Sequence, residues 1–90
     1  MKFTWDDNKN SKNIEKHGIS FYTAAKVFDD PNYIEIYDSE YSVEEDRYIA
    51  IGFVNKVLFV VFTERKDSVR LISARVATEL ERSLYYDNRI

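Results

Sequence analysis

The spacing of apolar residues changes near residue 32 and divides the chain into a helical part and a β-rich part. Before this point, four apolar residues follow the i, i+3, i+4, i+7 spacing of one helix face: Phe21, Ala24, Ala25 and Phe28. After it, Tyr33–Tyr37 alternates as a half-buried strand does. We therefore expect helices first and a sheet afterwards.

Capping residues frame two helices near the N-terminus. Asp6 is a favourable N-cap for the polar segment 7–17, and Gly18 most easily adopts the left-handed conformation that ends a helix. Ser20 is the expected cap of the second helix. Before them, Lys2–Trp5 alternates between polar and apolar residues, which predicts a short edge strand.

The β-rich part contains three further expected strands. Arg47–Phe53 alternates less strictly, whereas Val57–Phe62 is continuously apolar, which predicts a central strand covered on both faces. A short turn at Val54–Lys56 joins these two strands as a hairpin. A second turn at Lys66–Ser68 leads into a strand at Val69–Ile72.

The final segment, from Ala74 to about Asn88, is expected to be helical, with Ala77, Leu80 and Leu84 on one stripe. The order of elements predicts an α+β fold, in which an antiparallel β-sheet carries two N-terminal helices and one C-terminal helix. A chain of 90 residues has the length of one domain, so we expect a single domain over residues 1–90.

The composition narrows the classes of protein. Apolar residues make up 44% of the chain, enough for a packed core, and there is no cysteine, which removes disulfides and thiolate chemistry. The N-terminus has no apolar leader, and the longest apolar run, Val57–Phe62, is too short to span a bilayer. We therefore expect a soluble, cytoplasmic protein without a membrane partner.

The charge is unevenly distributed. Residues 29–46 contain eight acidic residues and no lysine or arginine. The rest of the chain has thirteen basic residues against eight acidic ones, a local charge of +5 within a net charge of −3. This split is compatible with phosphate binding at one surface and a basic protein partner at another, or with an acidic loop that is merely solvated.

Motifs for several classes of site are absent from the sequence. It has no glycine-rich phosphate loop, no His-x-x-x-His pair and no nucleophile elbow, and segment 38–46 lacks the spacing of a calcium loop. We therefore expect neither a metal nor a cofactor. What remains is a set of cations that the fold can bring together: Lys9, Lys16, His17, Arg65, Arg70, Arg75 and Arg82.

Only part of this set is expected to converge. Lys9 and Lys16 are seven residues apart and share one helix face. The turn after Arg65 places it near Arg70, whereas Arg75, which begins the predicted last helix, lies toward the opposite end of the sheet.

Cations without a metal suit the cleavage of RNA by its own 2′-hydroxyl. This reaction needs a group that takes the proton, positive charge around the phosphorane and a donor for the leaving oxygen. Arginine binds phosphate through two hydrogen bonds, and histidine exchanges protons near neutral pH. His17 has a second interpretation, because a cation at the C-terminus of a helix is favourable without any chemistry.

Three ordered blocks of the sequence carry a resemblance to a known family: FTWDDNKNSKNIEKHGISFYTAA, EDRYIAIG and TERKDSVRLISARVATELER. Over nearly the whole chain they resemble the BrnT family of bacterial toxins, type II toxin–antitoxin ribonucleases with a RelE-like fold. The resemblance implies metal-independent RNA cleavage, blocked translation and neutralisation by a cognate antitoxin of the BrnA type. It also implies a hetero-oligomer with that antitoxin, which binds DNA only as the complex.

The resemblance further implies site residues. Carried over by position, the catalytic set is Lys9, His17, Arg65 and Arg75, and the residues expected to bind RNA are Lys16, Arg70 and Arg82. In this hypothesis Arg65 and Arg75 hold the scissile phosphate. His17 or Lys9 moves protons, and Glu45 is a weaker candidate for the base.

Two other interpretations remain open. The two N-terminal helices have the length of a helix-turn-helix, but the second helix would have to present Phe21 to DNA, although Phe21 belongs to its apolar face. Alternatively, the chain is a toxin-like interaction protein without catalysis that only binds an antitoxin.

Overall fold

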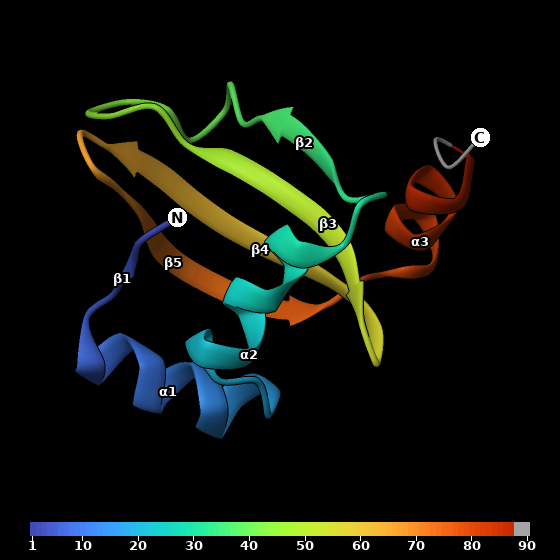
Figure 1. Ribbon diagram of the computed structural model, residues 1–90, viewed down its shortest axis with the longest axis horizontal. Coiled ribbons are helices and arrows are strands. Elements are labelled where there is room, and N and C mark those ends of the chain that lie inside the picture. The colour runs from blue at the N-terminus through green and yellow to red at the C-terminus, as the bar shows by residue number, and fades with distance from the viewer. Residues whose placement is uncertain (88–90) are drawn as a thin grey trace.

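The computed structural model describes residues 1–87 and contains a five-stranded sheet in the order β1-β5-β4-β3-β2 (Figure 1). The elements are β1 (Phe3–Thr4), α1 (Asp7–His17), α2 (Phe21–Ala25), the 3-10 helix η1 (Lys26–Asp29), β2 (Ile34–Tyr37), β3 (Tyr48–Val54), β4 (Lys56–Arg65), β5 (Ser68–Val76) and α3 (Glu79–Asp87). The predicted α+β fold is confirmed. One detail differs, because β1 runs parallel to β5 while the other neighbouring strands are antiparallel.

The capping bonds confirm the predicted start and end of α1 and the predicted start of α2, whereas the second helix, expected to include Phe28, becomes the 3-10 helix η1 from Lys26 onward. The Asp6 carboxylate accepts hydrogen bonds from N–H groups of the first turn of α1, the shorter at 2.8 Å. Gly18 ends α1 with a φ of 71°, a left-handed conformation that favours glycine. The Ser20 hydroxyl accepts a hydrogen bond from the Thr23 N–H at 3.0 Å and so begins α2.

The sheet has two faces, which we name after the helices that cover them. On the α2 face, the N-terminal helices pack over the larger core: Ile19, Phe21, Ala24, Val27, Ala50, Leu58, Val60, Phe62, Val69, Leu71 and Ala74. On the α3 face, α3 packs over a smaller core: Ile51, Val57, Ala77 and Tyr85. Figure 1 shows that α3 lies at one end of the sheet, so the α3 face stays open toward the other end.

A β-bulge interrupts the ladder between β4 and β5. Val61 pairs with Ser73, but the next residue, Phe62, pairs with Leu71. Ile72 is therefore an extra residue on β5 without a partner of its own.

The bulge decides which side chains of β5 share a face. Leu71 and Ala74 are three residues apart, yet both are buried in the core of the α2 face. Under strict alternation they would point to opposite faces. The extra residue also brings Arg70 and Arg75, five residues apart, onto the same α3 face.

The boundary between β5 and α3 corrects the sequence prediction. The helix was expected from Ala74, but β5 continues to Val76 and α3 begins at Glu79. Arg75 pairs with Phe59 of the central strand β4. Backbone pairing across the sheet therefore overrides the helix propensity of the alanines and arginines in this segment.

The stripe of α3 that faces the core also differs from the prediction. Leu80 and Leu84 are 73% and 40% exposed, whereas Tyr85 is buried. The Tyr85 hydroxyl donates a hydrogen bond to the Asp30 carboxylate at 2.6 Å. A buried tyrosine thus anchors α3 to the loop that precedes β2, and the predicted helix end at Asn88 lies outside the described residues.

Helix α1 packs through amide side chains instead of apolar ones. The buried Asn13 side chain donates to the backbone oxygens of Ile19 at 2.8 Å and Ala74 at 2.7 Å, and accepts from the Ala74 N–H at 3.1 Å. The Asn10 side chain accepts from the Phe21 N–H at 2.8 Å. These bonds hold α1 alongside β5, and the two run in the same direction (Figure 1).

Candidate functional site

Arginines gather on the α3 face. In the β4–β5 ladder, the partners are Ser68 for Arg65, Thr63 for Arg70 and Phe59 for Arg75. These β4 positions are an even number of residues apart, and paired residues point to the same side, so all three arginines lie on one face. Arg47 directly precedes Tyr48, which packs against the α2 face, so alternation places Arg47 on the α3 face as well.

Arg75 is held in a fixed position by two neighbours. Its guanidinium donates two hydrogen bonds to the Glu81 carboxylate, at 2.7 and 2.9 Å. Its central carbon lies 3.9 Å from the centre of the Phe59 ring, a cation–π contact. The hydrogen bonds with Glu81 raise the pKa of Arg75, although burial acts in the opposite direction. Both guanidinium nitrogens that bind Glu81 are therefore already engaged.

Glu81 also begins helix α3. Its carboxylate accepts from the Thr78 N–H at 2.8 Å, and the Thr78 hydroxyl accepts from the Glu81 N–H at 3.2 Å, which together form a capping box. The hydrogen bonds from Arg75 are the largest cause that lowers the pKa of Glu81, and the Thr78 N–H adds to it against the effect of burial. One carboxylate therefore fixes both the start of α3 and the orientation of Arg75.

Arg65 and Arg70 lie at the other end of the α3 face. Arg65 makes one contact of 3.3 Å with Glu45, and both side chains are about half exposed, at 50% and 47%. Arg70 is partly buried and forms no ion pair within residues 1–87. An exposed single contact of this kind contributes little stability. These two guanidinium groups are therefore more accessible to an anion than that of Arg75.

The distance along β4 separates Arg65 from Arg75. Their positions in the ladder are six residues apart, which corresponds to about 20 Å of extended strand. The strand register thus places Arg65 and Arg75 toward opposite ends of the sheet, as expected from the sequence. Arg75, however, belongs to β5 and not to the last helix. The arrangement allows the two arginines to contact separate phosphates of one strand, but not a single phosphate together.

Lys9 and Lys16 lie on the side of α1 that is turned away from α2. Both are exposed, and at about 100° per residue they flank Asn13 on the side opposite Asn10, whose amide contacts α2. Because Asn13 is bound to Ala74 of β5, the lysines border the edge between the two faces of the sheet.

His17 lies near the end of the sheet that carries Arg75. It lines a pocket with Lys56, Leu58 and Val76, the residue after Arg75. This pocket opens on the α2 face, since Leu58 belongs to the core there. The structure therefore brings His17 and Arg75 to the same end of the sheet, on opposite faces, and places both far from Arg65.

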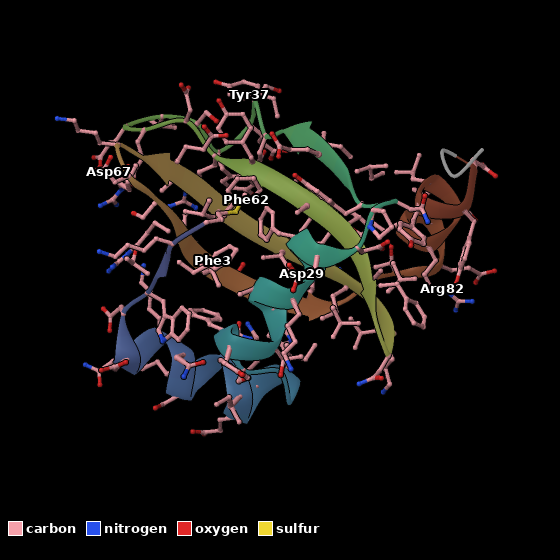
Figure 2. All side chains as sticks on the ribbon, viewed as in Figure 1. Phe3, Asp29, Tyr37, Phe62, Asp67 and Arg82 are labelled. Atoms are coloured by element: carbon pink, nitrogen blue, oxygen red, sulfur yellow. The ribbon has the colours of Figure 1, made fainter. Side chains whose placement is uncertain are left out.

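Arg82 lies on the exposed side of α3. It lines a pocket with Phe53, Lys56 and Tyr86, beyond the end of β5. Figure 2 shows Arg82 at the α3 end of the molecule and Asp67, in the β4–β5 turn, at the opposite end. Arg82 therefore lies at the end of the molecule away from the β4–β5 turn and from Arg65 and Arg70.

Sequence reasoning missed two residues that shape this site. Arg47 was visible one position before an alternating strand, a spacing that already places it opposite Tyr48. Glu81 was visible as the last residue of a Thr-x-x-Glu capping box beginning at Thr78. Its ion pair with Arg75, in contrast, depends on a strand boundary that the sequence does not reveal.

Residues 1–87 contain neither a helix that could span a membrane nor a group of side chains that could hold a metal ion. None of the helices in this range is long and apolar enough to cross a bilayer. Within the same range, no three histidine, cysteine or acidic side chains are grouped so that they could hold a metal ion.

Comparison with known protein families finds a match over most of the chain. Residues 5–81 match the family described as the ribonuclease toxin, BrnT, of type II toxin–antitoxin systems. The match extends from the residue before the Asp6 cap to Glu81, the partner of Arg75, and so includes the whole arginine-bearing ladder. No curated protein matches the chain.

Proposed function

Because the match spans most of its length, the chain belongs to the BrnT family of ribonuclease toxins of type II toxin–antitoxin systems, and from this premise we propose that it cleaves RNA without a metal ion and thereby blocks translation. The family supports the ribonuclease class and the existence of an antitoxin. The absence of metal from the reaction and the effect on translation are our proposals.

The proposed RNA-binding surface is the open part of the α3 face. The observation that carries this proposal is that Arg65 and Arg70 lie on one sheet face with little or no ion pairing. Arginine binds phosphate oxygens through paired N–H groups, and Arg47 adds a third guanidinium on the same face. The lysines of α1, Lys9 and Lys16, extend the basic surface around the edge of β5.

The proposed chemistry is attack of the 2′-hydroxyl on the adjacent phosphorus, which breaks the bond to the 5′ oxygen. Positive charge beside the phosphate stabilises the crowded intermediate, and Arg65 or Arg70 supplies it. For a phosphate at Arg65 or Arg70, Lys9 is our candidate for moving protons, whereas His17 can act only on a phosphate bound at its own end of the sheet, the end that carries Arg75. Arg75 then acts through a position fixed by Glu81 and Phe59.

The proposed setting is the cytoplasm, where a BrnA-like antitoxin neutralises the toxin in a hetero-oligomer. DNA is bound only by that complex. In α2, a helix of five residues whose Phe21 is buried, there is little surface for a DNA-reading helix.

The test is RNA cleavage by the purified protein in the presence of EDTA. Variants Lys9→Ala, His17→Ala, Arg65→Ala, Arg70→Ala and Arg75→Ala are compared after circular dichroism has shown native folding. Lys26→Ala serves as the control, because Lys26 lies on the other side of the molecule, over the Tyr22 ring.

We expect cleavage by the parent protein and by Lys26→Ala, and its loss in Arg65→Ala and Arg70→Ala. Full activity of His17→Ala would show that His17 has no role in cleavage and only supplies a favourable residue at the end of α1. If the parent cleaves neither free RNA nor RNA in a translating extract, the chain is an antitoxin-binding protein without catalysis and the proposal fails.

A further inference from the structure

An aromatic ladder crosses the end of the α2 face that the helices leave uncovered. Phe62 of β4, Tyr48 of β3 and Tyr37 of β2 follow one another with ring centres 5.6 and 5.5 Å apart. Phe62 is buried beneath Phe28 of η1, whereas Tyr37 is 49% exposed. Figure 2 shows Phe62 over the middle of the sheet and Tyr37 at its outer rim. The ladder therefore leads from the core to the surface.

Three carboxylates surround the outer part of this ladder. The Tyr37 hydroxyl donates a hydrogen bond to Asp46 at 2.9 Å. Glu35 and Glu64 occupy α2-face positions, since their partners Ala50 and Val69 belong to the core of that face.

The negative charge contributes to raised pKa values of two nearby tyrosines. Burial and then the charges of Asp46 and Glu64 raise the pKa of Tyr48. Burial, the charge of Glu35 and a hydrogen bond with it raise the pKa of Tyr33. The rings and the carboxylates thus form one electrostatic unit.

No ion pair within residues 1–87 involves these three carboxylates. The two ion pairs found in residues 1–87 are formed by Glu45 and Glu81, so neither uses Glu35, Asp46 or Glu64. All three carboxylates are exposed, and they are not grouped so that they could hold a metal ion. These three carboxylates are therefore open to a cationic group of another molecule.

We propose that this tyrosine–carboxylate surface, made of Tyr33, Glu35, Tyr37, Asp46, Tyr48 and Glu64, binds arginine or lysine side chains of a protein partner. A guanidinium or ammonium group over a tyrosine ring is attracted by the ring's negative face, and a carboxylate beside the ring adds a charge-assisted hydrogen bond. RNA is excluded here because its phosphates are repelled by the same carboxylates.

The partner is the neutralising antitoxin, so the inference rests on the proposed function for the identity of the partner but not for the binding chemistry. In this arrangement the antitoxin binds the tyrosine–carboxylate surface on the α2 face of the sheet. The α3 face, which is proposed to bind RNA, is a separate surface.

The experiment uses an amidated peptide of six arginines as the probe and measures its dissociation constant by calorimetry. Glu35→Gln/Glu64→Gln removes two charges from the surface, and Glu40→Gln/Glu44→Gln removes two from the exposed loop that follows β2, as a control with the same net charge. We expect at least tenfold weaker binding for the first pair and less than a twofold change for the second.

A third variant separates the rings from the charges. Tyr37→Leu keeps every carboxylate and removes an exposed aromatic face, and we expect it to weaken binding about threefold. Equal weakening by both charge pairs, or no effect of Tyr37→Leu, would overturn the proposal in favour of unspecific attraction between opposite charges.

The same variants distinguish this inference from the proposed function. Glu35→Gln/Glu64→Gln should cleave RNA within twofold of the parent while losing affinity for the cognate antitoxin, measured with the purified partner. If affinity for the antitoxin is unchanged, the inference fails and the ribonuclease proposal stands. If no variant and no parent cleaves RNA, the ribonuclease proposal fails and the binding result stands.

Discussion

The two faces of the sheet carry opposite chemistry at the end that lies away from α3. On one face, the guanidinium groups of Arg65 and Arg70 lie close to the β4–β5 turn. On the other, Glu64 belongs to a surface of tyrosines and carboxylates. Because Glu64 and Arg65 are consecutive residues, the difference arises from the alternation of side chains along a strand. A small sheet can in this way present separate surfaces to an anionic and a cationic partner.

The comparison also explains why the net charge of −3 is a poor guide to this protein. Half of the acidic residues lie in segment 29–46, which includes β2, while Arg47, Arg65, Arg70 and Arg75 share one sheet face. A phosphate that approaches the α3 face meets the local charge first, since other charges are screened by salt over about 10 Å. The net charge of the chain therefore conceals one basic surface and one acidic surface.

The largest expected effect comes from deleting Val61, which shifts the alternation of side chains in the central strand β4 by one residue. Without Val61, either Phe62 or Val60 leaves the core of the α2 face. We expect a loss of about 4 kcal/mol or more in the free energy of unfolding, measured by urea denaturation.

Two controls accompany this deletion. Deletion of Ile72 removes the extra residue of the bulge and leaves Leu71 and Ala74 two residues apart, so strict alternation keeps both in the core. Deletion of Ser39 shortens an exposed turn by one residue. Both should be much milder than the deletion of Val61. An unchanged unfolding midpoint after the deletion of Val61 would show that alternation along β4 does not set the faces.

The next effect concerns activity and compares neighbouring positions on opposite faces. Arg70→Ala should reduce the rate of RNA cleavage by about 100-fold, because it removes positive charge from the proposed phosphate site. Glu64→Ala, which alters only the α2 face, should stay within about twofold. Similar losses of activity in both variants would mean that RNA cleavage does not depend on the α3 face alone.

A smaller effect is expected from Glu81→Gln, which weakens the contact that fixes Arg75 on the α3 face. We expect a loss of about 1–2 kcal/mol of stability at neutral pH, because the ion pair is only partly buried. Glu79→Gln, on the same helix but exposed, should change stability by less than about 0.5 kcal/mol.

The pH dependence of this loss has a definite sign. The pKa of Glu81 is lowered in the folded protein, so its contribution is fully present above the ordinary value of 4.5 and is lost as the pH falls through the folded value. The difference in stability between parent and Glu81→Gln should therefore shrink in acid, as followed by thermal melts at several pH values. A difference that grew in acid would contradict the ion pair.

The smallest effect is spectroscopic and reports on the acidic face. Burial first, and then the charges of Asp46 and Glu64, raise the pKa of Tyr48, so Glu64→Gln should remove one of these causes and lower that pKa part of the way toward its ordinary value. Ultraviolet titration of tyrosinate detects the change, and Tyr48→Phe identifies the transition that belongs to Tyr48. A titration unaffected by Glu64→Gln would separate Glu64 from the tyrosine–carboxylate surface.

Local signals predicted the elements whose ends depend on neighbouring residues. Asp6, Gly18 and Ser20 cap their helices as expected, and the turn around Asn55 joins β3 to β4 with Asn55 at a φ of 62°. Caps and turns are decided within a few residues, so one sequence contains the necessary information.

The sequence predictions are wrong where contacts between distant segments determine the structure. The C-terminal half of β5 reads as a helix in the sequence, and only its pairing with β4 makes it a strand. The same pairing, with its bulge at Ile72, determines which face Arg75 occupies. The sequence therefore predicts that cations are present and that Arg65 and Arg75 are far apart, but not which side of the sheet carries them.

The hydrogen bonds between Asn13 and β5 have a consequence for how the chain behaves before it meets a partner. A strand at the side of a sheet offers free backbone groups that can recruit a strand from another molecule. At Ala74, the amide of Asn13 takes both of these backbone groups and so occupies the place of a sixth strand. With β1 paired to the start of β5, that border of the sheet offers fewer free backbone groups to another strand. The opposite border, at β2, is then the side on which another polypeptide can extend the sheet.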